Sequence, residues 1–174
     1  MNSYNHFLFS LSLCLLLLPP TPANAVLAVL FSLVFGVLID LDHVVNKRAP
    51  WYHKRTWLQE PLGLIIVGLP LALVLSLVIE ERLALLILVP YSSHILLDYL
   101  CVFEARPLAP FLSLKKKEGW GLFIPDDPFV KTENSKRWAR RVREKGIRGI
   151  SENYFTVFNL LLLVLVIVVR YTPL

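Results

Sequence analysis

The chain has 174 residues, enough for one domain, and its composition excludes an ordinary soluble protein. Apolar residues make up 56% of the chain and the mean hydropathy is +0.60, above the range of soluble domains. The 18 Lys and Arg outnumber the 13 Asp and Glu, giving a formal charge of +5. Two cysteines, Cys14 and Cys101, show neither a disulfide framework nor metal-ligand spacing. We therefore expect a membrane protein.

Five apolar segments are candidate spans: Phe7–Leu18, Ala23–Ile39, Leu62–Ile79, Leu83–Leu97 and Tyr154–Val169. A spanning helix needs about 20 apolar residues, so most of these segments are short for the task. Because backbone polar groups in lipid must be satisfied within helices, we predict an all-α integral membrane bundle of about five spans. Its expected parts are an embedded bundle at 1–100, a basic cytoplasmic loop at 101–153 and a C-terminal span at 154–174.

The first segment has two interpretations. Ala23-Asn24-Ala25 follows an apolar run and is similar to a signal-peptidase site. Residues 1–6 contain no Lys or Arg, however, so the positive start of a signal peptide is missing. We favour a short first helix, a proline-rich turn at Pro19–Pro22 and an antiparallel second helix.

The basic residues are concentrated in two segments. Four lie between the second and third apolar segments and twelve lie in 101–153, which leaves only Arg82 and Arg170 elsewhere. With five spans these two segments share one side, which the positive-inside rule makes cytoplasmic, with the N-terminus inside and the C-terminus outside. The basic stretch Ser135–Arg148 predicts contact with anionic lipid headgroups. No nucleic-acid motif accompanies it, so we expect no specific nucleic-acid partner.

This topology brings the ionisable residues near the span ends to the cytoplasmic face. His94 and Asp98 are four residues apart, and Asp40 and His43 are three apart, so each pair shares a helix face. Further polar residues fall on the same side: His6, Asp42, His53 and Glu60.

Imidazole and carboxylate groups that reach one face from separate helices predict a divalent metal site. Zinc, manganese and iron suit these ligands, and we expect Zn or Mn. Each pair alone also has an explanation without metal. His94 and Asp98 would then be a hydrogen-bonded pair, and Asp40 and Asp42 the solvated end of a span.

The motifs IDLDH, HKRTWLQEPLG, SHILLDYL and RPLAPF follow an N-terminal histidine in this order. In this the chain resembles the YdjM-like family of membrane-bound metal-dependent hydrolases, the LexA-binding, inner-membrane-associated type. The resemblance covers about residues 6–111, and GISENYF at 149–155 is similar to an archaeal branch. It implies a metal-binding set that falls on His6, Asp40, Asp42, His43, His53, His94 and Asp98.

Two positions depart from the family pattern. Ile39 replaces the proline that opens the first acidic element, and Gln59 stands near the second histidine expected after His53. Glutamine is a poor transition-metal ligand beside imidazole, which favours a weakened or altered centre. The adjacent Glu60 is a candidate substitute as ligand or base.

The sequence thus predicts an integral membrane metal-dependent hydrolase acting on an anionic ester, such as a phosphorylated lipid. The metal would activate water and polarise the substrate, and Asp42 or Glu60 would be the general base. The alternative is a non-catalytic protein whose polar cluster pins the helix ends and whose basic loop docks lipid or a protein partner. A transporter ranks last, because the outer halves of the apolar segments read as apolar.

Overall fold

Each of the five apolar segments forms a helix in the computed structural model, which describes residues 3–41, 57–101, 104–105, 117–118, 123–124 and 150–172. The helices are α1 (Ser3–Leu17), α2 (Pro22–Gly36), a continuous helix over Pro61–Val78, α6 (Arg82–Leu100) and α8 (Glu152–Tyr171). The continuous helix consists of α4 (Pro61–Gly63), a π-helical turn (Leu64–Gly68) and α5 (Leu69–Val78). Two 3-10 turns, Leu38–Leu41 and Trp57–Gln59, flank the gap between 41 and 57.

Three of these helices are long and apolar enough to cross a membrane: Pro61–Val78, α6 and α8. At about 1.5 Å per residue each is roughly 27–30 Å long, close to the hydrocarbon thickness of a bilayer. The 15 residues of α1 and of α2 give only about 22 Å each. The helical membrane fold is therefore confirmed, and five complete spans stay a prediction.

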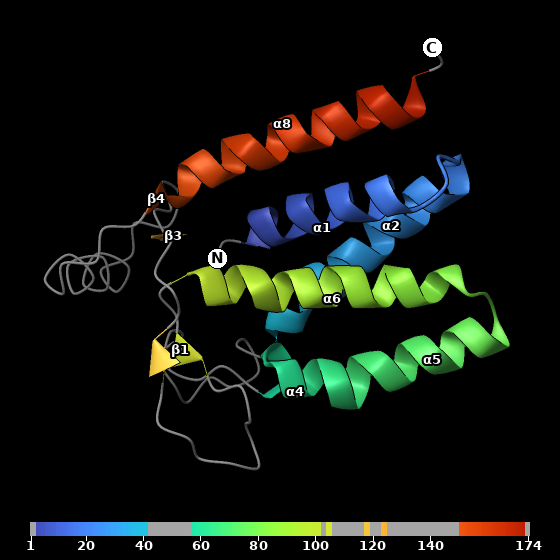
Figure 1. The fold of residues 1–174 in the computed structure, drawn as a ribbon, viewed down its shortest axis with the longest axis horizontal. Coiled ribbons are helices and arrows are strands. Elements are labelled where there is room, and N and C mark those ends of the chain that lie inside the picture. The colour runs from blue at the N-terminus through green and yellow to red at the C-terminus, as the bar shows by residue number, and fades with distance from the viewer. Residues whose placement is uncertain are drawn as a thin grey trace, which may run out of the picture.

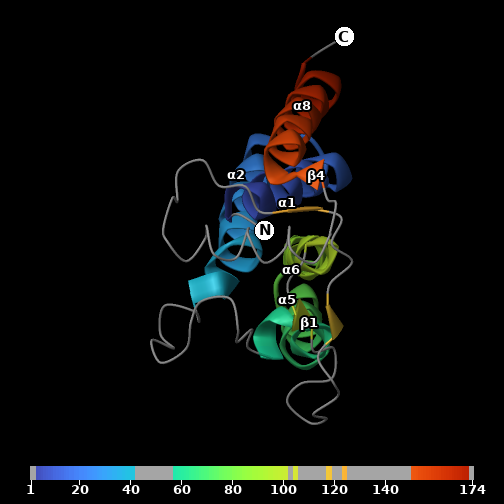
Figure 2. The same ribbon diagram turned by 90° about the vertical axis from the view of Figure 1, so that its left-hand side faces the viewer.

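The helices form a stack in which α1, α2 and α6 are central, with α1 antiparallel to α2 and α6 and parallel to α8 (Figure 1). Seen end-on, α8 lies at one edge, α1 and α2 follow, then α6, and α5 lies at the other edge (Figure 2). Burial agrees with this order: 56% of the α6 window is buried, against 17% for Pro61–Val78 and 11% for the α8 helix. The two edge helices therefore expose most of their apolar surface.

Local sequence explains where the helices turn and bend. The predicted proline-rich turn is present: the Thr21 side chain caps α2 by accepting from the Asn24 amide, and Pro22 occupies the first helical turn. Pro70 has no amide proton for an α-helical bond, and the π-helical turn directly before it accommodates that loss, with the Leu69 amide donating to the Leu64 carbonyl.

The segment predicted as a loop contains two small strand pairs, which corrects the all-α prediction in that region. β1 (Glu104–Ala105) pairs antiparallel with β2 (Lys117–Glu118). β3 (Phe123–Ile124) pairs parallel with β4 (Ile150–Ser151), directly before α8. The second pair places residues 123–124 at the start of the last helix.

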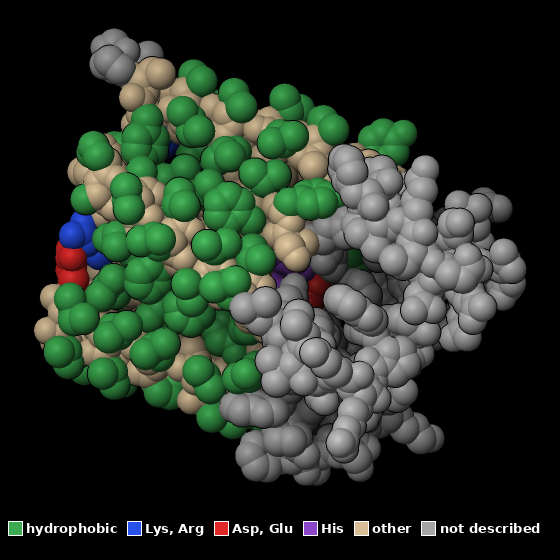
Figure 3. Space-filling model, turned by 180° about the vertical axis from the view of Figure 1, so that it is seen from behind, with side chains coloured by type: hydrophobic (Ala, Val, Ile, Leu, Met, Phe, Trp, Pro, Cys, Tyr) green, Lys and Arg blue, Asp and Glu red, His purple; other side chains and the backbone are tan. Residues whose placement is uncertain are grey.

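Apolar packing closes the end of the bundle near the turns after α1 and α5. Leu11, Leu15, Leu18, Ala28 and Leu86 are all buried there in one cluster. The outer surface of the helices is also mainly apolar, as the hydrophobic side chains in Figure 3 show. A surface of this kind suits hydrocarbon, and large exposed apolar areas are rare on soluble monomers.

Candidate metal centre

Two histidines and one aspartate meet at the end of the bundle where α1 begins and α6 ends. One ligand atom from each of His6, His94 and Asp98 lies within 4.8 Å of the other two. The His6 Nε2 is 3.1 Å from Asp98 Oδ1, and the His94 Nε2 is 3.4 Å from Asp98 Oδ2. The two imidazole rings stack with their centroids 4.1 Å apart. Both histidines are fully buried, and Asp98 is 5% exposed.

The orientation of His94 is fixed by the end of α2. Its Nδ1 lies 2.9 Å from the Gly36 carbonyl oxygen, which can only accept, so Nδ1 carries the proton and Nε2 keeps a lone pair that faces Asp98. A metal-binding histidine typically has its other nitrogen held in this way. Glycine at position 36 lets α2 pack closely against α1, because a Cβ there would lie 2.8 Å from Ser10 Oγ.

The spacing of the three side chains is compatible with a bound metal ion as well as with a hydrogen-bonded group. Tetrahedral zinc with bonds of about 2.0–2.2 Å separates its ligand atoms by about 3.4 Å. The two separations, 3.1 Å to Asp98 Oδ1 and 3.4 Å to Asp98 Oδ2, are close to that spacing, each to a different carboxylate oxygen. Within the described part of the chain, neither ring nitrogen of buried His6 makes a hydrogen bond of good geometry. Buried polar atoms normally have partners, and an ion would supply one here.

The chain belongs to the YdjM inner membrane protein family. The sequence model of that family matches residues 1–173, so the match covers both the bundle and the segment between α6 and α8. No curated protein and no solved structure matches the chain. Membership in a family of inner membrane proteins, together with three helices of spanning length, supports location in a membrane.

The remaining residues predicted for the YdjM-family site are placed only in part. Asp40 belongs to the 3-10 turn Leu38–Leu41, which follows α2 at the end of the bundle that holds the histidines. Asp42, His43 and His53 lie outside the described residues. The ligand roles of these four stay predictions.

Glu60, a predicted general base, is fully buried and held by α6. The Tyr99 hydroxyl donates a hydrogen bond of 2.6 Å to Glu60 Oε2. Gln59 beside it is also fully buried. A second tyrosine fixes the same segment, because the Tyr91 hydroxyl donates to the Leu58 carbonyl at 2.5 Å. Glu60 is not among the three residues of the candidate metal group, which was found among the described residues alone.

Hydrogen bonds between polar side chains join α1 to α6 and to α8 near the histidines. The Ser10 and Ser93 hydroxyls are 2.7 Å apart, between α1 and α6. The Asn159 amide donates to Asn5 Oδ1 at 3.2 Å, which ties α8 to the start of α1. These contacts link the three helices around the candidate metal centre.

The interpretation of the outer halves as apolar was wrong at the far end. Asn24 is 1% exposed there and accepts a hydrogen bond from Arg82, while Arg170 donates to the Leu18 carbonyl at 2.8 Å. The apolar cluster around Leu15 and Leu86 lies between this polar group and the histidines. The two polar ends are therefore separated by packed hydrocarbon, which is unfavourable for a transport path.

Three contributors to the site were missed by sequence reasoning. Tyr99 directly follows Asp98, and Gly36 opens the stretch GVLIDLDHVV, so both lie inside motifs that drew attention for other residues. Ser10 lies four residues after His6 on the same helix face, a spacing that could have identified it. None has a side chain that suggests metal chemistry by itself.

Proposed function

We propose that this protein is an integral membrane metal-dependent hydrolase that acts on an anionic ester at the cytoplasmic interface. The observation that carries the proposal is the buried group of His6, His94 and Asp98, with His94 oriented by the Gly36 carbonyl. Two imidazoles and one carboxylate are a ligand set found in catalytic zinc sites that keep an open coordination position.

A divalent ion, Zn or Mn, bound by these residues would supply Lewis-acid activation of the ester and of the attacking water. In the hydrolysis of a phosphate ester, the water oxygen bonds to phosphorus, the bond to the alcohol oxygen breaks, and the alcohol takes up a proton. A carboxylate, Glu60 or Asp42, accepts the proton that the water loses. Tyr99 keeps the Glu60 carboxylate in one position through its hydrogen bond.

The charge distribution supports the proposed orientation. Sixteen of the 18 basic residues lie in the two segments that flank the histidine end of the helices, and the positive-inside rule makes this the cytoplasmic end. We propose five spans, with 101–153 as a cytoplasmic segment whose basic residues contact anionic lipid headgroups. The C-terminus is then outside.

The test is metal content and hydrolysis in detergent-purified protein. Wild type is compared with His94→Ala, and Leu85→Ala is the matched control because Leu85 is 44% exposed on the same helix. Zn or Mn should copurify with wild type and with the control. The metal content should fall about tenfold or more in His94→Ala. Removing a residue that only orients a metal ligand already costs 10–100-fold, so removing the ligand itself should cost at least as much. Phosphate release from p-nitrophenyl phosphate and from phosphatidic acid should fall in parallel.

A non-catalytic function is the second candidate, and Gln59 favours it. Gln59 is fully buried where the family pattern expects a histidine, which removes one predicted ligand. On this hypothesis His6, His94 and Asp98 only stabilise the packing of α1 against α6. Absence of Zn and Mn from wild type, with hydrolysis unchanged in His94→Ala, would favour this second function and refute the first.

A further inference from the structure

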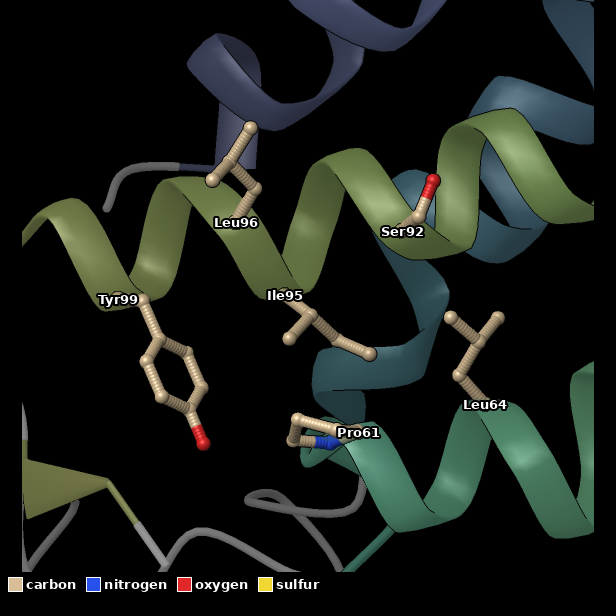
Figure 4. A pocket seen from close by; sticks show the side chains of 6 residues that line it. All are labelled: Pro61, Leu64, Ser92, Ile95, Leu96 and Tyr99. Carbon is tan, nitrogen blue, oxygen red and sulfur yellow. The ribbon is translucent and has the colours of Figure 1, made fainter. Parts of the chain in front are cut away.

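An apolar groove lies on the outer side of α6, facing the Pro61–Val78 helix. It has a volume of about 290 Å³ and is lined by Pro61, Leu64, Ser92, Ile95, Leu96 and Tyr99. Ile95 and Tyr99 point from α6 toward Pro61 and Leu64 on the opposite wall (Figure 4). Ile95 is buried at the floor, whereas Leu96 on the rim is 45% exposed. The groove is therefore open to the surroundings of the bundle.

We infer that this groove binds the acyl chain of the lipid substrate, which reaches it sideways from the bilayer. The inference rests on the proposed function and specifies its substrate as a membrane lipid in place of a water-soluble ester. Both walls belong to helices of spanning length, and neighbouring side chains such as Ile65 and Leu69 are about half exposed on an apolar surface. In a membrane the molecules that reach such a surface are lipids, so the occupant is a hydrocarbon chain.

The polar end of the groove lies toward the proposed chemistry. Tyr99 lines the groove and also donates its hydroxyl to Glu60, and it directly follows Asp98 in the chain. A chain held along Ile95 thus runs toward the end of α6 that carries the candidate metal ligand Asp98 and, through Tyr99, contacts the candidate base Glu60. Remote binding energy of this kind positions a reacting group.

The headgroup is chosen from the basic residues that precede and follow the two groove helices in the sequence. Lys54 and Arg55 precede Glu60, and Arg106 follows Cys101 closely along the chain. Basic residues next to membrane-spanning helices attract anionic lipids. We therefore choose phosphatidic acid as the probe, and neutral phosphatidylcholine as its comparison.

The experiment is acyl-chain photolabelling of the purified full chain in phosphatidylcholine nanodiscs. The probe is phosphatidic acid with a diazirine midway along one acyl chain, and labelled peptides are identified by mass spectrometry. In wild type, label should concentrate several-fold on peptides containing Leu64 and Ile95 relative to those containing Leu73. The same diazirine on phosphatidylcholine should label the groove less.

Two variants fill the groove, Ile95→Trp and Leu64→Trp, and each should reduce groove labelling several-fold. Leu64 is only half-buried, so its variant serves as the second arm if Ile95→Trp does not fold. Leu73→Trp is the matched control, since Leu73 is 59% exposed and does not line the groove. It should leave groove labelling unchanged.

His94→Ala separates this inference from the proposed hydrolase. It should lose metal and hydrolysis but keep groove labelling, because His94 does not line the groove. Label spread evenly over the apolar surface, or undiminished in folded groove-filling variants, would overturn the acyl-chain site even if metal and hydrolysis were present. Groove labelling without metal in wild type would leave a lipid site and refute the hydrolase.

Discussion

Gly36→Ala is expected to weaken both the bundle and its candidate metal centre. The new Cβ would lie 2.8 Å from Ser10 Oγ, where ordinary contact begins near 3.4 Å, so either the Ser10 hydroxyl turns away from Ser93 or α1 and α2 move apart locally. Overpacking of this kind costs about 1–3 kcal/mol. The helix-propensity gain of alanine over glycine is at most about 1 kcal/mol, and it is smaller here because Gly36 ends α2.

Movement of α1 and α2 apart would also move the Gly36 carbonyl that orients His94, and loss of such support typically costs 10–100-fold in metal affinity. Thermal unfolding in detergent, followed by circular dichroism with and without Zn, measures stability, and chelator competition measures affinity. Val34→Ala is the control at an exposed position of α2. Ser10→Ala combined with Gly36→Ala should recover most of the affinity, because the colliding oxygen is gone. Wild-type stability and affinity in Gly36→Ala alone would refute the argument.

Two further substitutions test how the helices around the centre are held. In Gly68→Ala the Cβ would lie 2.8 Å from Leu64 Cδ1 and 3.0 Å from the Tyr91 ring, so both side chains must shift and the Tyr91 hydrogen bond to the Leu58 carbonyl should weaken. Limited proteolysis should then cleave before Pro61 faster than in wild type, and equal cleavage would contradict this. Asn159→Ala removes the hydrogen bond to Asn5 and should lower stability by about 0.6–1.7 kcal/mol in detergent, whereas Leu161→Ala, at an exposed position, should have little effect. Equal losses in these last two variants would show that the hydrogen bond does not hold α8.

The helices and the pairing of His94 with Asp98 followed from the sequence, because hydropathy and four-residue spacing act locally. The sequence predicted only that His6 lies on the same membrane face as His94 and Asp98, not that it contacts them. Its stacking on His94 depends on how closely two helices pack, which a single sequence does not state. Tyr99 was missed because its contact with Glu60 joins residues 39 positions apart through tertiary packing.

Small and polar residues on α1 and α2 explain that close packing. The buried residues of α2 are Asn24, Ala28, Ser32 and Gly36, which form one four-residue ridge. The facing ridge on α1 is His6, Ser10 and Cys14, continued by Leu18 directly after the helix, and all four are buried. Ridges of this type interlock at a crossing angle of about −50°, and α2 does run obliquely across α1 and α6 (Figure 1).

Packing and site chemistry therefore depend on the same positions. Glycine and serine at the crossing let the backbones approach, and this approach brings the Gly36 carbonyl to His94 and the His94 ring to His6. A larger residue at Gly36 would leave every metal-ligating side chain present and still disturb their geometry. For this reason stability and metal affinity should change together in variants of the ridge, whereas variants of His94 should change affinity first.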